Sequence, residues 1–240
     1  VILCRLITFS AASLTTMSWR SSGSTNQDLV DRLRDNGLIK NDRIHAALSS
    51  VDRKNYCRKG SSPYNDSPQS IGHGATISAP HMHAWCLELL VDHLKPGMKA
   101  LDVGSGSGYL TAAMAQMVGA EGMVVGVEHL PELVEFSESN VAKDSPELKS
   151  QISFHATDGR KGWEEHAPYN AIHVGAAAPE VPKPLLEQLA IGGRMIIPVA
   201  RGGGGDQYLM QIDRKSELEY VEKSITGVRY VPLGDRGDYY

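Results

Sequence analysis

The stretch LDVGSGSGYL, residues 101–110, decides the fold of this chain. It opens with residues typical of a short buried strand, continues into a turn with glycine at every second position, and ends where an apolar helix begins. A strand, a glycine turn and a helix start in this order let backbone N–H groups of the turn face a ligand. We therefore expect a nucleotide-like ligand at this turn.

The spacing of the glycines excludes two common nucleotide sites. The dinucleotide fingerprint G-x-G-x-x-G requires a third glycine three residues after the second, but Tyr109 stands there after Gly104 and Gly106. The phosphate-loop pattern ending in Gly-Lys-Ser or Gly-Lys-Thr is also absent. The pattern present, D-x-G-x-G-x-G over residues 102–108, resembles the first motif of the Rossmann-like methyltransferases that bind S-adenosyl-L-methionine.

Acidic side chains favour the same cofactor, because Asp102, Glu128 and Asp158 each stand near the end of a predicted strand. Parallel strands end at one edge of a sheet, and such sheets bind ligands there. S-adenosyl-L-methionine carries no phosphate, so the turn needs no lysine. A carboxylate after the second strand could accept hydrogen bonds from both ribose hydroxyls, and one after the third from the adenine amino group.

Strand and helix patterns alternate along most of the chain. We expect strands at residues 99–104, 122–129, 152–159, 169–177, 194–200, 208–215 and 220–233, with helices at 109–118, 130–143 and 184–193. Further helices are expected at 25–39, with a cap-like Asn26, and at 41–51 and 79–94. This alternation predicts an α/β fold, a Rossmann-like doubly wound and mostly parallel sheet with a helical N-terminal appendage.

We expect one methyltransferase domain over residues 17–240. Residues 17–95 would form its helical N-terminal part with the substrate loop, and 96–240 its cofactor-binding sheet and C-terminal strands. Residues 1–16 are too short for a membrane span, and Arg5 interrupts the apolar centre that a signal peptide requires. We interpret them as an upstream or non-native extension before Met17, with a targeting segment as the alternative.

The net charge and the cysteine content limit the ligands and the cellular compartment that this chain is expected to have. The formal net charge of −4 and a pI of about 6.1 argue against a nucleic-acid-binding surface. The odd number of cysteines, Cys4, Cys57 and Cys86, lacks metal-site spacing and indicates a reducing compartment without disulfides. We therefore expect a cytoplasmic enzyme that is not bound to a membrane.

The residues after the fourth predicted strand limit which kinds of methyl acceptor are possible. Amine methyltransferases usually carry an Asn/Asp-Pro-Pro-aromatic motif there, whereas this chain has HVGAAAP at residues 173–179. No cluster of Asp and Asn metal ligands and no double-glutamate loop for an arginine substrate is evident, so no metal is expected. An acceptor that needs no deprotonation remains, such as a carboxylate, which is ionised at neutral pH because its pKa is about 4.

Residues 67–83 are the region where a carboxylate would bind. They contain no Asp, Glu, Lys or Arg, although 22% of the chain is charged. A cleft for a carboxylate should avoid acidic groups. The hydroxyls of Thr76 and Ser78, with backbone amides around Gly72 and Gly74, could hold an anion.

At this point the resemblance to one family becomes specific. The motifs SPQSIGHGATISAPHMHA, ALDVGSGSGYL, AIHVGAAAP, GGRMIIPV and GVRYVPL resemble those of the protein L-isoaspartate (D-aspartate) O-methyltransferases, from about Met17 to Leu233. The resemblance implies a monomeric repair enzyme that methylates the carboxylate of L-isoaspartyl and D-aspartyl residues in damaged proteins and peptides. S-adenosyl-L-methionine would become S-adenosyl-L-homocysteine, and the ester would close to a succinimide without enzyme help.

The resemblance also implies which residues form the site. Those expected to bind the cofactor are Ala75, Thr76, Ile77, Ser78, His83, Asp102, Gly104, Gly106, Ser107, Glu128, His129, Asp158 and Gly159. Those expected to contact the substrate are Ser78, His83 and Val231, with Ser78 as the active-site residue. The family often has Thr or Ser after VPL, where this chain has Gly234, which offers no hydroxyl.

Two other functions remain open from the residues alone: a small-molecule carboxyl methyltransferase, and an inactive methyltransferase-like binding scaffold. Individual side chains also have structural interpretations. His81 at a helix start is expected to cap or pack, and His173 is too dispersed from the other histidines for a metal site. Met82 and Trp85 are expected in the core. No partnered His–Asp set is evident for Ser78, which favours a positioning role over a nucleophilic one.

Overall fold

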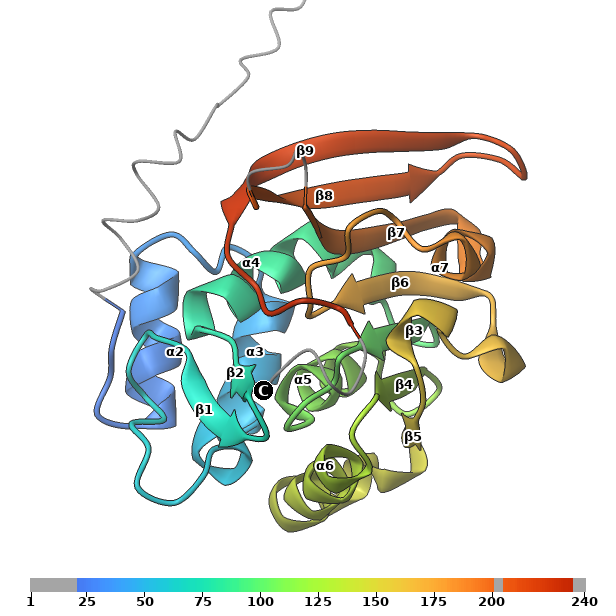
Figure 1. Cartoon of the computed structure of the whole chain (residues 1–240). Coiled ribbons are helices and arrows are strands. Elements are labelled where there is room, and N and C mark those ends of the chain that lie inside the picture. Colours follow the sequence, from blue (N-terminus) through green and yellow to red (C-terminus); the bar gives the residue numbers. More distant parts are fainter. Residues whose placement is uncertain (1–20, 201–204, 235–240) are drawn as a thin grey trace, which may run out of the picture.

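The structure is a computed structural model that describes residues 21–200 and 205–234. Its main sheet has seven strands in the order β5-β4-β3-β6-β7-β8-β9, as Figure 1 shows. The strands are β3 (Lys99–Val103), β4 (Met123–Glu128), β5 (Ile152–Ala156), β6 (Tyr169–Val174), β7 (Leu189–Ala200), β8 (Gln207–Arg214) and β9 (Tyr220–Val228). Strands β3 to β7 pair in parallel, and β8 and β9 continue the sheet antiparallel. The predicted mostly parallel, Rossmann-like α/β fold is confirmed.

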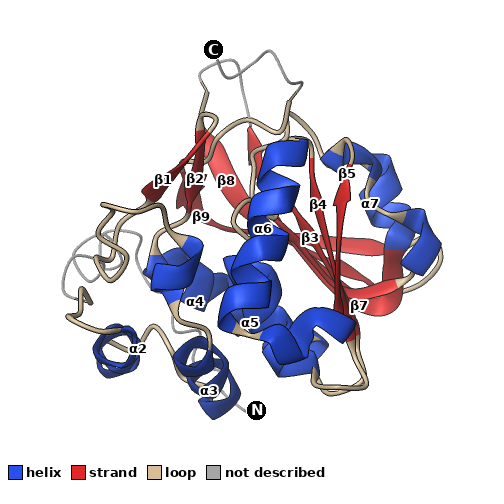
Figure 2. Cartoon of the chain, turned by 90° about the horizontal axis from the view of Figure 1, so that it is seen from below, coloured by secondary structure: helices blue, strands red, loops and turns tan. Residues whose placement is uncertain are grey.

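Apolar side chains alternate between the two faces of the sheet and so bury both. Ala100 and Val124 pack into the core under one group of helices, whereas Leu101 and Val125 pack into the core on the opposite face. Figure 2 shows this layering. On the first face lie α4 (Pro80–Leu90), α5 (Tyr109–Val118) and α6 (Pro131–Asp144), and on the second lies α7 (Lys183–Gln188).

The N-terminal helices α2 (Asn26–Asp35) and α3 (Asp42–Ser50) extend the first of these cores. The cap of α2 is Thr25, whose side chain accepts a hydrogen bond from the backbone N–H of Asp28. The expected cap, Asn26, lies instead inside the helix, where its buried amide donates to the carbonyl of Leu48 at 2.9 Å. That amide links α2 to α3, so a long-range contact outweighs the residue's local capping preference.

Two segments differ from the sequence expectation. Residues 67–83, where no strand was expected, contain a short hairpin, β1 (Gln69–Gly72) with β2 (Ala75–Ile77), before α4 begins at Pro80. The helix expected over 184–193 ends at Gln188, because Leu189 pairs with Tyr169 and begins β7. Single-turn 3-10 helices cover Arg53–Tyr56, Val91–His93, Pro146–Ser150, Gly159–Lys161 and Glu164–His166.

The interpretation of residues 1–16 and of Met17 lies outside the described residues, as does much of the connection before β8. Among the residues that are described, no helix is long and apolar enough to cross a membrane.

Replacing Gly108 with alanine should destabilise the fold more than the same change at Gly97. Both have nearly the same left-handed φ, +82° and +81°, but a Cβ on Gly108 would lie 3.0 Å from Ser137 Cβ and 3.1 Å from Phe154 Cζ, whereas Gly97 faces open space. Gly97→Ala should therefore cost about 1–2 kcal/mol of unfolding free energy, and Gly108→Ala about 1–3 kcal/mol more. Urea unfolding of both variants measures this, and equal losses would show that contact at the turn is unimportant.

Candidate active site

The glycine turn after β3 brings the backbone of three elements together. Gly104 has a φ of +77°, and a Cβ there would lie 3.8 Å from the backbone of Gly175, which follows β6. The backbone amides of Gly104 and Ser105 donate to the carbonyl of Val127 in β4, at 2.8 and 3.1 Å. The turn is therefore fixed at the carboxyl ends of β3, β4 and β6.

A small cavity of about 40 Å³ lies against this turn. Of the predicted site residues, its lining contains Thr76, Ile77, Ser78, His83, Asp102, Gly104, Gly106 and Ser107. The structure adds Ser105, Tyr109, Leu110, His173 and Gly175. The predicted residues that do not line it are Ala75, Glu128, His129, Asp158, Gly159 and Val231. Eight of the predicted residues therefore converge on one place, and the other six lie outside its lining.

Glu128 adjoins the small cavity through the backbone of the turn. Its side chain is buried, and its Oε2 accepts a hydrogen bond from the N–H of Gly106 at 3.1 Å. Its Oε1 accepts from the N–H of His129 at 2.8 Å and lies 2.8 Å from His129 Nδ1. A carboxylate has about four lone-pair positions, so Oε2 can accept a further hydrogen bond from a ligand.

Asp158 lies two strands from the turn, after β5, and is tied to its neighbour Arg160. The Arg160 guanidinium donates to both carboxylate oxygens, with Nη2 to Oδ2 at 2.9 Å. These hydrogen bonds are the main reason that the pKa of Asp158 lies below its ordinary value. Beside it, a Cβ on Gly159 would lie 2.7 Å from Val103 Cγ1, so the backbone there approaches the end of β3 closely.

A buried network holds Asp102, and sequence reasoning missed its partner His173. Asp102 Oδ2 accepts from the hydroxyl of Thr111 at 2.6 Å, and Oδ1 lies 2.9 Å from His173 Nδ1. Burial alone would lower the pKa of His173, but hydrogen bonds to Asp102 and Cys86 outweigh it and raise the pKa to about 10. The raised pKa favours the protonated form of His173, which lies against the Asp102 carboxylate.

His83, on the same cavity, has the opposite protonation state. Burial, followed by the positive charges of Arg53 and His173, lowers the pKa of His83 well below its ordinary value. Its ring lies 5.2 Å from that of Tyr109, and within the described residues Nδ1 has no hydrogen-bond partner. His83 is thus a neutral imidazole with a polar atom available to a ligand. His81, in contrast, has its Nδ1 2.8 Å from Asp66 Oδ1.

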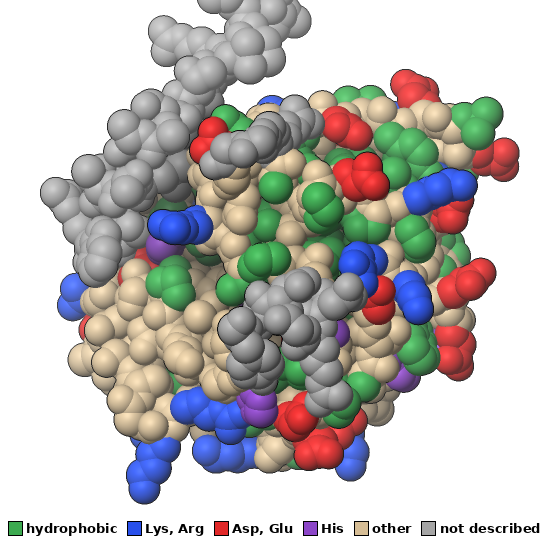
Figure 3. Space-filling view, viewed as in Figure 1, with side chains coloured by type: hydrophobic (Ala, Val, Ile, Leu, Met, Phe, Trp, Pro, Cys, Tyr) green, Lys and Arg blue, Asp and Glu red, His purple; other side chains and the backbone are tan. Residues whose placement is uncertain are grey.

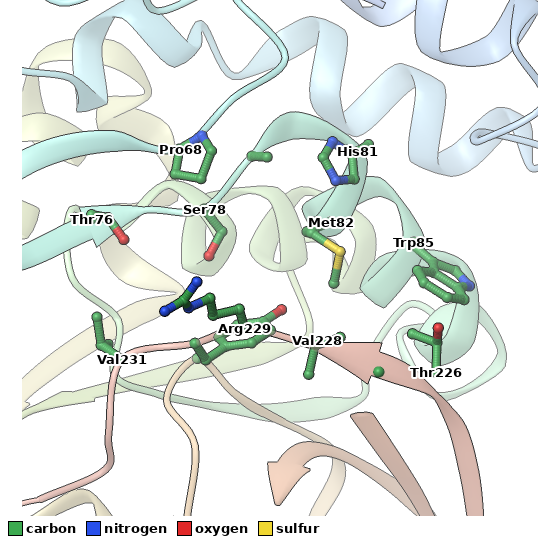
Figure 4. A pocket seen from close by; sticks show the side chains of 14 residues that line it. Pro68, Thr76, Ser78, His81, Met82, Trp85, Thr226, Val228, Arg229 and Val231 are labelled. Carbon is green, nitrogen blue, oxygen red and sulfur yellow. The ribbon is translucent and has the colours of Figure 1, made fainter. Parts of the chain in front are cut away.

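A larger cavity of about 590 Å³ lies between the start of α4 and the chain that follows β9, as Figure 4 shows. It is lined by Pro68, Thr76, Ser78, Ala79, His81, Met82, Trp85, Gly175, Thr226, Gly227, Val228, Arg229, Tyr230 and Val231. Met82 and Trp85 are half-buried on its wall, and Met82 also packs against the core, so the expectation that both are core residues holds only in part. No acidic side chain occurs in this lining.

The two cavities meet at Thr76, Ser78 and Gly175, which line both. Ser78 stands between β2 and α4, and its carbonyl accepts a hydrogen bond from Nη2 of the fully buried Arg53 at 2.8 Å. On the opposite side, the carbonyl of Val231 accepts from the N–H of Ala177 at 2.7 Å, which fixes the C-terminal segment across the edge of the sheet. The chain therefore holds a polar junction between a glycine-lined cavity and a larger, mostly apolar one.

Comparisons with known proteins agree with this geometry. The model of the family protein-L-isoaspartate (D-aspartate) O-methyltransferase matches residues 24–238. The chain is 53% identical over 214 residues to the protein-L-isoaspartate O-methyltransferase of Triticum aestivum, covering 88% of this chain and 92% of that one. It is 52% identical over 226 residues to that of Caenorhabditis elegans, covering 93% and 99%.

A solved structure shows the same relationship. The putative protein-L-isoaspartate O-methyltransferase of Plasmodium falciparum, crystallised with S-adenosyl-L-homocysteine, has a TM-score of 0.80 and 37% sequence identity, and the match covers 88% of this chain and 99% of that one. Together with the family match over nearly the whole chain, this confirms the predicted resemblance. The chain belongs to the protein-L-isoaspartate (D-aspartate) O-methyltransferase family.

Proposed function

We propose that this chain carries out the family's repair reaction, methyl transfer to the carboxylate of isoaspartyl residues, where its two cavities meet at Ser78. The observation that supports this is the shared lining: Thr76, Ser78 and Gly175 face both the cavity at the glycine turn and the larger one without acidic groups. A methyl donor held on one side and a carboxylate on the other would come together beside Ser78. L-Isoaspartyl and D-aspartyl residues are the acceptors we assign to the larger cavity.

The residues at the turn fit S-adenosyl-L-methionine. The cavity of about 40 Å³ is far below the roughly 300–1,000 Å³ of complete ligand pockets, so it holds only part of the molecule. The remainder would extend along the open edge past Glu128 toward Asp158. Two buried side-chain atoms without a partner in the described structure, His83 Nδ1 and Ser105 Oγ, are available for its polar groups. When bound, the cofactor supplies an electrophilic methyl group on a sulfonium.

The protein's own part in the step is positioning rather than proton transfer. The acceptor carboxylate is already ionised at neutral pH, and His83 is neutral with a lowered pKa, so no side chain needs to remove a proton. Ser78 would orient the acceptor through its hydroxyl. Arg53 holds the backbone of Ser78 in place by donating a hydrogen bond to its carbonyl. Met82 and Trp85 would exclude water from the reacting groups, which strengthens electrostatic interactions there.

We also propose that the enzyme works in the cytoplasm as a monomer, without nucleic acid. The net charge of −4 supports the last point, and in Figure 3 Lys and Arg side chains alternate with Asp and Glu over the β8–β9 end of the molecule. Cys57 and Cys86 are both free thiols, which supports a reducing compartment.

Glu128→Gln should weaken S-adenosyl-L-methionine binding on the order of 10-fold or more, because charge-assisted hydrogen bonds to the ribose hydroxyls become neutral ones. Calorimetry on the purified chain measures the affinity, and Glu121→Gln, a change at an exposed residue, is the matched control. Thermal unfolding without ligand should show that the turn still folds. An unchanged affinity would mean that Glu128 does not bind the ribose.

The substrate assignment is tested with a peptide containing one isoaspartyl residue and its twin containing normal aspartate. The isoaspartyl peptide should be methylated far faster, since the extra backbone carbon changes where the carboxylate lies relative to the methyl group. Transfer of radioactive methyl groups measures both rates. Similar rates for the two peptides, or faster transfer to free carboxylic acids, would favour a small-molecule carboxyl methyltransferase, and no transfer at all would favour a binding scaffold.

Ser78→Ala should lower kcat/KM by roughly 10- to 1000-fold, the effect of losing one or two hydrogen bonds that position the acceptor. Ser78→Asp should be worse, because it places a like charge beside the carboxylate. Steady-state kinetics with the isoaspartyl peptide checks both variants, with cofactor affinity as the control for folding. A loss near the millionfold typical of a catalytic nucleophile, or a trapped methyl-serine, would contradict the positioning role.

A further inference from the structure

Arg229 is a charged residue on the larger cavity that lies within the motif GVRYVPL but received no role of its own from the sequence. It follows β9 directly and lines the cavity together with Ser78 and Val231. In Figure 4 its side chain extends across the cavity so that the guanidinium and the hydroxyl of Ser78 point toward one another. The only other lining residue that can carry a positive charge is His81, whose Nδ1 is engaged by Asp66.

The backbone at Arg229 is fixed by its neighbours. The side-chain amide of Gln207 accepts from the N–H of Tyr230 at 2.6 Å and donates to the carbonyl of the same residue at 3.0 Å. One residue further, the carbonyl of Val231 accepts from Ala177 at 2.7 Å. The guanidinium therefore projects from a held segment, which limits where it can reach.

The guanidinium has no partner within the described part of the chain: no hydrogen bond, ion pair or aromatic ring there engages Arg229, although Arg53, Arg160 and Arg194 all have such contacts. The lining offers none either, because it contains no Asp or Glu. An arginine has five N–H donors and no acceptor. A cavity with such a cation and no anion is suited to an anionic ligand.

We infer that Arg229 binds the carboxylate of the isoaspartyl acceptor, which rests on the function proposed above. One carboxylate oxygen would accept from the guanidinium, and the other would stay directed past Ser78 toward the small cavity at the glycine turn. If the guanidinium bound both carboxylate oxygens, it would reduce the reactivity of both. The geometry therefore requires that the guanidinium binds one oxygen and leaves the other available to the methyl group. Arg229 is thus a substrate-positioning residue that selects a charged acceptor.

If Arg229 binds the carboxylate, replacing it should weaken the binding of a charged substrate and not that of an uncharged one. The probes are an end-blocked peptide whose only ionisable group is its isoaspartyl carboxylate, and its twin in which that carboxylate is a carboxamide. Calorimetry with saturating S-adenosyl-L-homocysteine measures their affinities. Arg229→Gln should weaken binding of the acid peptide on the order of 10- to 100-fold, the effect of losing a charge-assisted hydrogen bond, and should leave the affinity of the amide peptide unchanged.

Two further variants separate a direct contact from a general effect of charge. Lys223→Gln removes a positive charge from β9 at a residue that does not line the cavity, and should leave both affinities unchanged. Arg229→Lys retains the charge and should restore part of the preference for the acid. In turnover, Arg229→Gln should raise KM for the acid peptide by a similar factor while kcat changes much less.

The outcomes distinguish this inference from the proposed function. If the wild-type chain binds the acid and amide peptides equally, no charged group of the larger cavity contacts the carboxylate and this inference fails, while methyl transfer to the acid peptide decides separately whether the proposed function stands. If the wild-type chain prefers the acid and Arg229→Gln retains the full preference, Arg229 is not the contact and only this inference fails. If the loss appears only with peptides that carry an additional Asp or Glu, Arg229 binds a flanking residue instead, and the inference is overturned.

Discussion

The close packing of neighbouring side chains against the backbone of the glycine turn is the constraint on which the rest of the structure depends. A Cβ on Gly106 would lie 3.2 Å from Ile71 of the hairpin, and one on Gly108 would meet Ser137 and Phe154 at 3.0 and 3.1 Å. The hairpin, α6 and β5 therefore all lie against one short turn that a side chain would push apart. Because we propose that the cofactor binds at the same turn, a side chain added there would affect both the stability of the fold and the binding of the cofactor.

The two cavities of the site differ in the charged groups that line them. The small cavity holds Asp102 paired with His173, whose raised pKa favours its protonated form, and a neutral His83. The larger cavity has no acidic lining residue and one arginine. A positively charged sulfonium and a negatively charged carboxylate can thus each find a suitable environment, on opposite sides of Ser78.

The sequence predicts an element correctly where that element depends on residues close together in the chain. A strand followed by left-handed glycines and an apolar helix requires no distant partner, so residues 101–110 were placed correctly. The early end of α7 could not be predicted, because it depends on Leu189 pairing with Tyr169, twenty residues earlier. His173 and Arg229 were missed for the same reason: the contact of His173 with Asp102, and the cavity that Arg229 shares with Ser78, both join residues far apart in sequence.

The position of the larger cavity has a consequence for the proteins that are repaired. In the proposed function an acceptor must reach Ser78, which is half-buried between β2 and α4 in the cavity that the chain after β9 also lines. A cavity of about 590 Å³ admits a short extended segment but not a folded surface. A damaged residue inside a helix or sheet must first leave its own structure, at the free energy of that local opening. Repair of a given protein is then limited by how often the protein itself opens at the lesion.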